Sequence, residues 1–322
     1  MLRRSLLATP AMLAAPALLG SLPARAQGTL KMTIATGVDP SFAPFYVAKE
    51  GGFFEKHGLD VSLNTGPSGS AMVAFLIGDQ INAAFGAEQA GVSAHLRDPN
   101  VVVVAEGTTL LRWMNVLARG VETMDGLKGK KVGVAHGTGS ETFWLSVVAK
   151  LKLNPTDYTI VNVEAPEMVA ALERGNIDAF AVWEPWPTRA LKAIPGTKSL
   201  VNNEQIQIIR TFIYMNKAWA EKNGEATQRF MQAMVGANAS IDSDREKAVQ
   251  QVARFLRLDR GLVGELMGKV RYPFDLTPDT AGNVQLAIDQ LRGMGKLAKE
   301  VTPAELIWPA PLKAAAPDRV RI

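Results

Sequence analysis

The side chains that most often carry out catalysis are scarce in this 322-residue chain. It contains no cysteine, which excludes thiolate catalysis and cysteine-ligated zinc, and its three histidines have no metal-ligand spacing. No serine lies in a G-x-S-x-G turn, and Gly129-Lys130 is followed by Lys131 rather than by the Ser or Thr of a phosphate-binding loop. We therefore expect that the chain is not an enzyme and that it uses neither a metal nor a cofactor.

Two turns rich in glycine and hydroxyl side chains are the first candidates for a binding site. They are G-P-S-G-S (66–70) and G-T-G-S-E (137–141), and each lies between a predicted strand and a predicted helix. Free backbone N–H groups at the start of a helix attract an anion or a carbonyl oxygen, although an ordinary helix cap is the alternative for either turn alone. The third glycine of a dinucleotide fingerprint is missing, because Thr142 occupies that position. The candidate residues are Ser68, Gly69, Ser70, His136, Thr138, Gly139 and Ser140.

Aromatic and acidic residues follow other predicted strands. In open α/β sheets, ligands bind at the carboxyl ends of the strands, and small-molecule pockets combine aromatic walls with a few polar groups. Core packing is the alternative for each tryptophan considered alone. The candidates at such positions are Ser41, Phe42, Glu88, Glu184 and Trp186.

Short apolar runs alternate with helical patterns, which predicts an α/β fold with mainly parallel sheets flanked by helices. The predicted strands are 31–36, 59–64, 81–85, 101–105, 131–135, 159–163, 179–182 and 211–215. The predicted helices are 44–56, 70–77, 89–96, 141–151, 166–174, 228–241, 246–256 and 280–291.

An internal similarity indicates that the fold has two lobes. M-V-A-x-L (72–76) and I-x-A (81–83) recur as M-V-A-x-L (168–172) and I-x-A (177–179), at a shift of 96 residues. We expect one lobe to consist of residues 28–110 and 212–322 and the other of residues 115–208. Crossings near 109–115 and 207–216 would form a hinge, and Trp113 in the first crossing is a further site candidate. The tail 314–322 is expected to be loose.

The first 26 residues have the features of an export signal. Arg3 and Arg4 precede an apolar stretch, and Ala24-Arg25-Ala26 fits a cleavage site. The paired arginines also match part of a twin-arginine signal, so export by Sec and by Tat both stay open. We expect a periplasmic protein, cleaved near Ala26, that is monomeric and not embedded in a membrane.

Most of the basic excess belongs to this segment. The formal net charge is +4, but three of the 35 basic residues lie before residue 27, so 32 remain against 31 acidic residues. A nearly neutral chain without a basic cluster among aromatic residues is not expected to bind nucleic acid.

Three stretches are similar to those of a known family. They are P-F-Y-V-A-K-E-x-G-F-F-E-K-x-G-L-D-V (44–61), L-K-G-K-K-V-G-V (127–134), and A-A-L-x-x-G-x-I-D-A (170–179) with W-E-P (183–185). They resemble periplasmic substrate-binding proteins of ATP-binding-cassette importers for nitrate, sulfonates, taurine and thiamine-pyrimidine precursors. The resemblance implies a type II two-lobed fold with two hinge crossings, a ligand between the lobes, and delivery to a permease in the inner membrane.

The resemblance also implies roles for the candidate residues. The two turns would hydrogen-bond an anionic or carbonyl group, and Glu184 would hold a cationic or N–H group. Carboxylates at Glu88, Glu141 and Glu184 would repel a bare anion in a desolvated cleft, although which of them contacts the ligand stays open. The expected ligand is a taurine-like aminosulfonate or a flat amine-bearing heterocycle stacked on Phe42 or Trp186.

Two other classes of function remain as alternatives. An enzyme on the same architecture is disfavoured, because the enzymes of the thiamine-pyrimidine branch use cysteine and are cytosolic. A sensory protein that presents its closed form to a receptor is not distinguished from a transport protein by the sequence.

Overall fold

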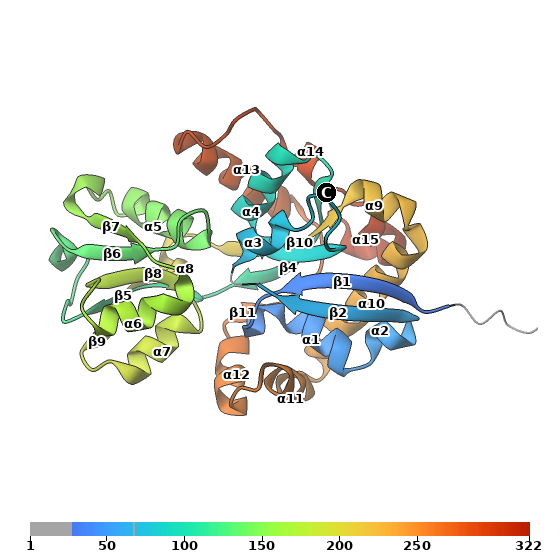
Figure 1. The fold of residues 1–322 in the computed structure, drawn as a ribbon, viewed down its shortest axis with the longest axis horizontal. Helices are drawn as coiled ribbons and strands as arrows, with labels where there is room; N and C mark the ends of the chain where they lie inside the picture. The colour runs from blue at the N-terminus through green and yellow to red at the C-terminus, as the bar shows by residue number, and fades with distance from the viewer. Residues whose placement is uncertain (1–27, 67) are drawn as a thin grey trace, which may run out of the picture.

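The computed structural model describes residues 28–66 and 68–322, so the export signal predicted for residues 1–26 lies outside the described residues. Two sheets form the centres of two lobes, which lie side by side in Figure 1. We call the part around the six-stranded sheet lobe 1 and the part around the five-stranded sheet lobe 2. The predicted two-lobed α/β fold is confirmed.

Each sheet contains strands that are distant in sequence. The strand order is β11-β4-β10-β3-β1-β2 in lobe 1 and β7-β6-β8-β5-β9 in lobe 2. The strands of lobe 1 are β1 (Leu30–Thr36), β2 (Leu59–Thr65), β3 (Ala83–Ala87), β4 (Val101–Leu110), β10 (Ile209–Asn216) and β11 (Val270–Arg271). The strands of lobe 2 are β5 (Met114–Arg119), β6 (Lys131–Val134), β7 (Thr159–Asn162), β8 (Ala179–Trp183) and β9 (Thr197–Asn202).

Most strands of each sheet run in one direction. β2 and β3 pair in parallel with β1, as β7 and β8 do with β6. β10 is antiparallel to β3 and β4, and β5 is antiparallel to β8 and β9. Because β5 and β10 are the first strands after a crossing between lobes, each enters its sheet from the cleft side and runs against its neighbours.

One buried side chain joins the two crossings. The chain passes from lobe 1 to lobe 2 between β4 and β5 and returns between β9 and β10. The Oδ1 atom of Asn203 accepts hydrogen bonds from the N–H groups of Trp113 (2.7 Å) and Met114 (2.9 Å). Its Nδ2 atom donates to the carbonyl oxygen of Leu110 (2.8 Å). The amide of Asn203 therefore fixes the position of one crossing relative to the other.

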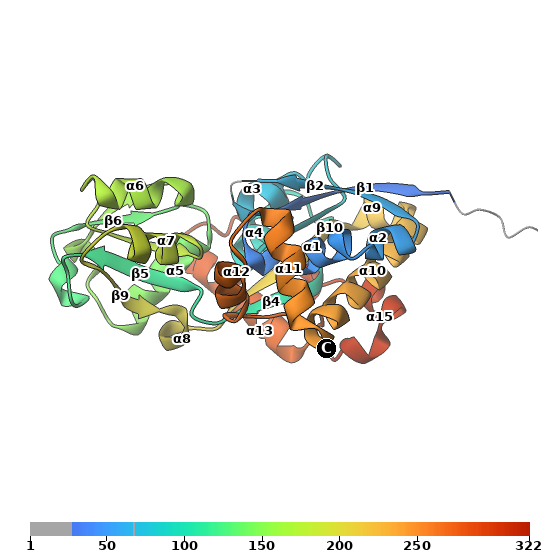
Figure 2. The same ribbon diagram turned by 90° about the horizontal axis from the view of Figure 1, so that it is seen from below.

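Helices cover both sides of each sheet, as Figures 1 and 2 show. In lobe 1, α3 and α13 pack against α4 on one side, and α10 and α11 pack against α1 on the other. The helices of lobe 1 are α1 (Ala43–Glu50), α2 (Phe53–Lys56), α3 (Gly69–Ala74), α4 (Glu88–Arg97), α9 (Lys217–Lys222), α10 (Gly224–Ser243), α11 (Arg245–Leu256), α12 (Arg260–Met267), α13 (Pro278–Gly293), α14 (Pro303–Leu306) and α15 (Ala310–Ala315). Those of lobe 2 are α5 (Gly139–Lys150), α6 (Met168–Glu173), α7 (Trp186–Ala193) and α8 (Asn203–Ile206). Among the residues described, no helix has the length and apolar character needed to cross a bilayer.

The core follows from the alternation of side chains along the strands. On β8, Ala179 and Ala181 belong to a large apolar cluster that continues into lobe 1. Phe180 and Val182 belong to a smaller cluster on the other face of the same sheet. Successive residues of a strand point to opposite faces of the sheet, so the four residues 179–182 contribute alternately to the two clusters.

The predicted helix 44–56 is divided in the structure. α1 ends at Glu50 and α2 begins at Phe53, and Gly52 between them has a φ of +71°. This left-handed conformation suits glycine and cannot continue a right-handed helix.

The expectation that the tail 314–322 is loose is wrong. The carbonyl oxygen of Arg319 accepts a hydrogen bond from the N–H group of Leu276 (2.9 Å). The Arg321 guanidinium forms an ion pair with Asp275 (2.7 Å). These contacts attach the tail to lobe 1, although its composition of Ala, Pro and Arg gave no sign of them.

Candidate functional site

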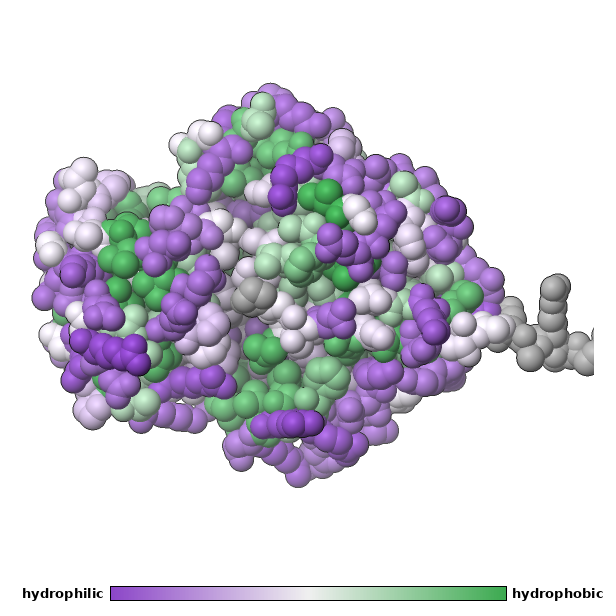
Figure 3. Space-filling view, viewed as in Figure 1, coloured by the Kyte–Doolittle hydropathy of each residue, from purple (hydrophilic) through white to green (hydrophobic). Residues whose placement is uncertain are grey.

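A cavity of about 140 Å³ lies between the two lobes. This volume is close to that of an apolar cavity that holds one benzene molecule. On the face shown in Figure 3, pale and apolar residues occupy the middle, where the lobes meet, and hydrophilic residues dominate the periphery. The predicted site residues that line the cavity are Ser41, Phe42, Ser68, Gly69, Ser70, Trp113, Thr138, Gly139 and Trp186.

Aromatic side chains contribute much of the cavity wall. Phe42 and Phe85 come from lobe 1, and their ring centroids are 4.6 Å apart. Trp183 and Trp186 come from lobe 2, and Trp113 comes from the first crossing. Flat rings on several sides favour a ligand with a flat apolar body.

The two glycine- and hydroxyl-rich turns meet across the cleft. α3 and α5 begin at Gly69 and Gly139, and both glycines line the cavity. The Ser70 hydroxyl of lobe 1 donates a hydrogen bond to the carbonyl oxygen of Gly137 in lobe 2 (2.5 Å). The turns therefore face each other, as their matching positions in the two lobes predicted.

The cap hydroxyls of both helices are already hydrogen-bonded. Ser68 Oγ accepts from the N–H group of Ala71 (3.3 Å), and Thr138 Oγ1 accepts from the N–H group of Ser140 (3.1 Å). In both turns, the residue whose hydroxyl caps the helix therefore also lines the cavity.

Gly69 is required where α3 contacts β3. A Cβ atom at Gly69 would lie 2.9 Å from the Cα atom of Gly86, which is closer than such atoms approach in proteins. Backbone therefore packs directly on backbone at this point, and the first turn of α3 lies against the end of β3.

Asp39 contributes a carboxyl group to the cavity wall. It follows β1 and caps the short 3-10 helix Pro40–Phe42, where its Oδ1 atom accepts hydrogen bonds from Ser41 N (2.9 Å) and Ser41 Oγ (2.6 Å). Burial raises the pKa of Asp39 to about 6, although the hydrogen bonds from Ser41 oppose this shift. Among the described residues that line the cavity, Asp39 is the one with an ionisable side chain.

Asp39 was not among the site residues predicted from the sequence. Asp39 lies three residues after a strand, in the same loop as Ser41. Ser41 was predicted as a site residue because it follows that strand. Asp followed by Pro is also a common helix start, so the sequence alone does not distinguish a capping aspartate from one that faces a ligand.

Comparison with known proteins identifies the family. The NMT1/THI5-like family matches residues 39–246, which is more than half of the chain and includes most of both sheets. The chain belongs to the NMT1/THI5-like family. A Brucella abortus protein named only as a binding protein is 27% identical over 218 residues, covering 66% of this chain and 67% of that protein. A Bacillus subtilis protein named as an aliphatic sulfonates-binding protein is 25% identical over 246 residues, with 73% of each chain covered.

Solved structures show the same fold. The periplasmic aliphatic sulphonate binding protein SsuA from Escherichia coli superposes with a TM-score of 0.74. The comparison covers 87% of this chain and 97% of that one, at 21% identity. Likeness at this identity shows the fold, which is the two-lobed fold of periplasmic binding proteins.

Two predicted acidic residues of this NMT1/THI5-like protein do not line the cavity. The Glu184 carboxylate is buried and pairs with Lys269 of lobe 1 (2.8 Å), while its other oxygen accepts from the N–H group of Thr188 (3.1 Å). Glu88 turns toward α13, where Asn283 Nδ2 donates to its Oε1 atom (3.0 Å). Both carboxylates are therefore directed to partners within the protein, and we leave them out of the site proposed below.

Two other predicted residues are also outside the cavity lining. The Ser140 hydroxyl, in the first turn of α5, is buried and donates to the carbonyl oxygen of Ala181 (2.5 Å). His136 is exposed, and its backbone N–H group donates to Asn162 Oδ1 (3.1 Å). Both residues shape the turn that carries Thr138 and Gly139.

Ion pairs join the lobes on both sides of the cavity. Lys269, just after α12, pairs with Glu184, and Lys296, just after α13, pairs with Glu141 of α5 (2.8 Å). The pKa of Glu141 is lowered, because hydrogen bonds from Lys296 and the Gly137 N–H group outweigh the effect of its partial burial. Together with the contact between Ser70 and Gly137, these pairs connect the two lobes across the cleft.

Proposed function

We propose that this chain is the periplasmic solute-binding component of an ATP-binding-cassette importer. It captures a small organic solute between its lobes and delivers it to a permease in the inner membrane. The observation that carries this proposal is a ring-sized cavity lined by both lobes in a member of the NMT1/THI5-like family. The Bacillus subtilis relative, named for binding aliphatic sulfonates, supports a small organic molecule as the solute.

Closure of the hinge is the functional event. The solute enters the open cleft, and its contacts with both lobes stabilise the closed form relative to the open form. No bond of the solute needs to be made or broken, so we propose that the protein is not an enzyme. It acts as a monomer after export, and the Sec or Tat route remains a prediction from the residues before Gly28.

The proposed site consists of cavity-lining groups from both lobes. Phe42, Trp113 and Trp186 contact the apolar body of the solute, and the first turns of α3 and α5 contact its polar groups. The members of the proposed site taken over from the sequence are Ser41, Phe42, Ser68, Gly69, Ser70, Trp113, Thr138, Gly139 and Trp186.

Mass spectrometry of protein purified without refolding tests this function. We expect a small molecule to be released on denaturation, unchanged in mass after incubation with the protein. Adding it back should reduce the radius of gyration in small-angle X-ray scattering and raise the melting temperature.

A pair of tryptophan variants locates the binding site. Trp186→Ala should weaken binding of the recovered solute at least about tenfold, because a ring that contacts the solute contributes about 1.5 kcal/mol or more. Trp308→Ala removes a half-buried ring of lobe 1 that does not line the cavity, and it should leave affinity unchanged. Failure to retain any solute, together with an unchanged scattering profile for every sulfonate and amine tested, would contradict the proposed function.

A further inference from the structure

A single carboxyl group in the cavity wall indicates the chemistry of the solute. We propose that Asp39 is the charged recognition group of the cavity and that it binds a cationic or N–H-donating nitrogen carried on a flat apolar body. This inference rests on the proposed function and deepens it, because it names the class of solute and the residue that selects it.

The geometry of Asp39 leaves one carboxylate oxygen available. Both hydrogen bonds from Ser41 go to Oδ1, at 2.9 Å from the backbone nitrogen and 2.6 Å from the hydroxyl oxygen. Oδ2 accepts no hydrogen bond from the residues that the structure describes, and it is not among the fully buried unpartnered atoms. The residue is 7% exposed and lines the cavity, so a ligand within the cavity can reach this oxygen.

The other deeply buried carboxylates obtain their partners from within the protein. Glu184 pairs with Lys269 at 2.8 Å, and Glu106 pairs with Arg210 at 2.9 Å. Glu88 accepts a hydrogen bond from Asn283, and it lies outside the cavity lining.

Asp39 and Glu88 both lack an ion pair with any described residue, although a buried carboxylate is unfavourable without a positive partner. Asp39 differs from Glu88 and from the other buried carboxylates because it is the one that faces the cavity. The missing positive partner can therefore be supplied by the solute.

The remaining lining limits the solute further. Among the described residues that line the cavity, none is lysine, arginine or histidine, so an inorganic anion would meet a carboxylate without a compensating cation. Phe42 lies three residues from Asp39, and the rings of Trp113 and Trp186 complete an apolar wall. A nitrogen that contacts Asp39 while a flat ring contacts these side chains satisfies both features.

Calorimetry with ring probes of matched size tests the role of Asp39. Benzamidine carries a flat cation, benzyl alcohol is neutral, and benzenesulfonate is anionic. Wild-type protein should bind benzamidine at least about tenfold more tightly than the other two. Asp39→Asn should remove that preference, because it deletes the charge while an amide oxygen still accepts from Ser41.

A matched variant controls for the loss of a capping aspartate. Asp98 accepts a hydrogen bond from the N–H group of Asn100 (2.9 Å), the same arrangement that Asp39 has with Ser41, but it does not line the cavity. Asp98→Asn should therefore leave the preference for benzamidine intact. Melting temperatures of both variants establish that each is folded.

The possible results separate this inference from the proposed function. If Asp39→Asn binds benzamidine as the wild type does, or if the wild type prefers benzenesulfonate, the role of Asp39 is overturned while solute binding stands. The same holds if the solute recovered by mass spectrometry has no nitrogen. If no probe binds and no solute is recovered, both proposals fail.

Discussion

Glu88 is a buried carboxyl group whose two oxygens have unequal surroundings. Oε1 accepts the hydrogen bond from Asn283, whereas Oε2 is buried without a partner among the described residues. Burial raises the pKa of Glu88 from 4.5 to about 7, against the hydrogen bonds that lower it. The folded protein therefore holds Glu88 largely protonated in mildly acidic solution.

Replacing Glu88 by glutamine should change how stability depends on pH. Because the folded pKa lies above the unfolded value, Glu88 contributes its full stabilisation below pH 4.5, and this contribution is lost as pH rises to about 7. The loss amounts to at most about 3 kcal/mol in the free energy of unfolding. Glu88→Gln has no such loss, so its stability relative to the wild type should increase between pH 4.5 and pH 8.

Urea denaturation at several pH values measures this difference. Asp39, Glu106 and the other titrating groups are the same in both proteins, so their contributions cancel in the comparison. Glu55→Gln, which removes an exposed carboxylate paired with Lys49, serves as the control and should show no comparable trend. A stability difference for Glu88→Gln that stays constant from pH 4.5 to pH 8 would show that burial does not shift this group.

The loops that line the cavity were easier to predict from the sequence than the partners of single side chains. Ser68, Gly69, Thr138 and Gly139 could be found because a strand, a glycine-rich turn and a helix follow one another locally. The partner of Glu184 is Lys269, 85 residues away in sequence and in the other lobe. A carboxylate that contacts a ligand and one that contacts a distant lysine look identical in sequence.

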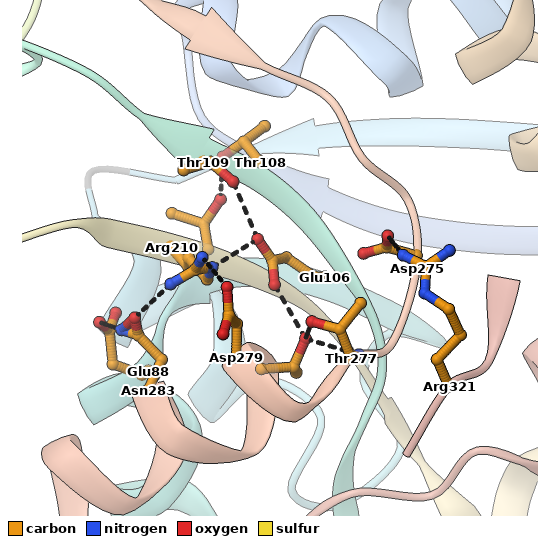
Figure 4. Close-up of polar contacts among 12 residues, drawn as sticks. Glu88, Glu106, Thr108, Thr109, Arg210, Asp275, Thr277, Asp279, Asn283 and Arg321 are labelled. Carbon is orange, nitrogen blue, oxygen red and sulfur yellow. Dashed lines mark hydrogen bonds and ion pairs between the residues drawn. The ribbon is translucent and has the colours of Figure 1, made fainter.

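At the level of secondary structure elements, Arg210 links two strands and a helix. It lies on β10, and its guanidinium pairs with Glu106 of β4 (2.9 Å) and with Asp279 of α13 (3.2 Å). It also donates to Asn283 of α13 (3.1 Å), which connects this cluster to Glu88 of α4, as Figure 4 shows. β10 begins directly after the return crossing, so Arg210 attaches the base of the hinge to lobe 1.

Removing Arg210 should destabilise the protein strongly. Arg210→Met leaves the Glu106 carboxylate, whose side chain is 3% exposed, without its positive partner. The loss of one partner of a buried pair costs about 3–5 kcal/mol in the free energy of unfolding. Arg210→Met combined with Glu106→Gln should recover most of that loss, because no unpaired charge then remains buried.

An exposed ion pair provides the comparison for Arg210. Lys198 and Glu122 pair on the surface of lobe 2 with side chains 56% and 68% exposed, so Lys198→Met should cost less than about 1 kcal/mol. Equal losses for Arg210→Met and Lys198→Met in urea denaturation would refute the proposed importance of burial.

The elements themselves were predictable where one local pattern dominated. β4 was evident from Val101 to Ala105, since a continuous apolar run buried on both faces has few alternatives. β9 was missed, because its six residues are mostly polar and only Val201 is buried. It is held in place by pairing with β5, which no local pattern reveals.

Ion pairs between the two lobes cross the cleft. The Glu184 carboxylate of lobe 2 is buried against Lys269 of lobe 1, whose side chain is 20% exposed. Lys192 of lobe 2 lies 3.9 Å from Glu265 of lobe 1, but these side chains are 65% and 50% exposed. The two pairs bridge the same lobes and differ in burial, so they offer a direct test of which contact controls closure.

Lys269→Met should shift the protein toward the open form. In the closed form, the variant keeps Glu184 buried without its cation, whereas opening exposes the carboxylate to water. A difference of about 2 kcal/mol lowers the closed-to-open ratio about 30-fold, and the apparent affinity for solute falls with the fraction of closed protein. Lys192→Met should change neither quantity, because the exposed pair contributes little.

Because the chain has no cysteine, Lys150→Cys and Lys222→Cys can place one spin label on each lobe for measuring the distance between them. We expect a longer mean distance for Lys269→Met without solute, a distance like that of the wild type for Lys192→Met, and partial return when Glu184→Gln is added to Lys269→Met. If Lys269→Met keeps the wild-type distance and affinity, the buried ion pair does not hold the lobes together. Return on addition of Glu184→Gln would identify the unpaired carboxylate, rather than the lost length of the lysine side chain, as the cause of opening.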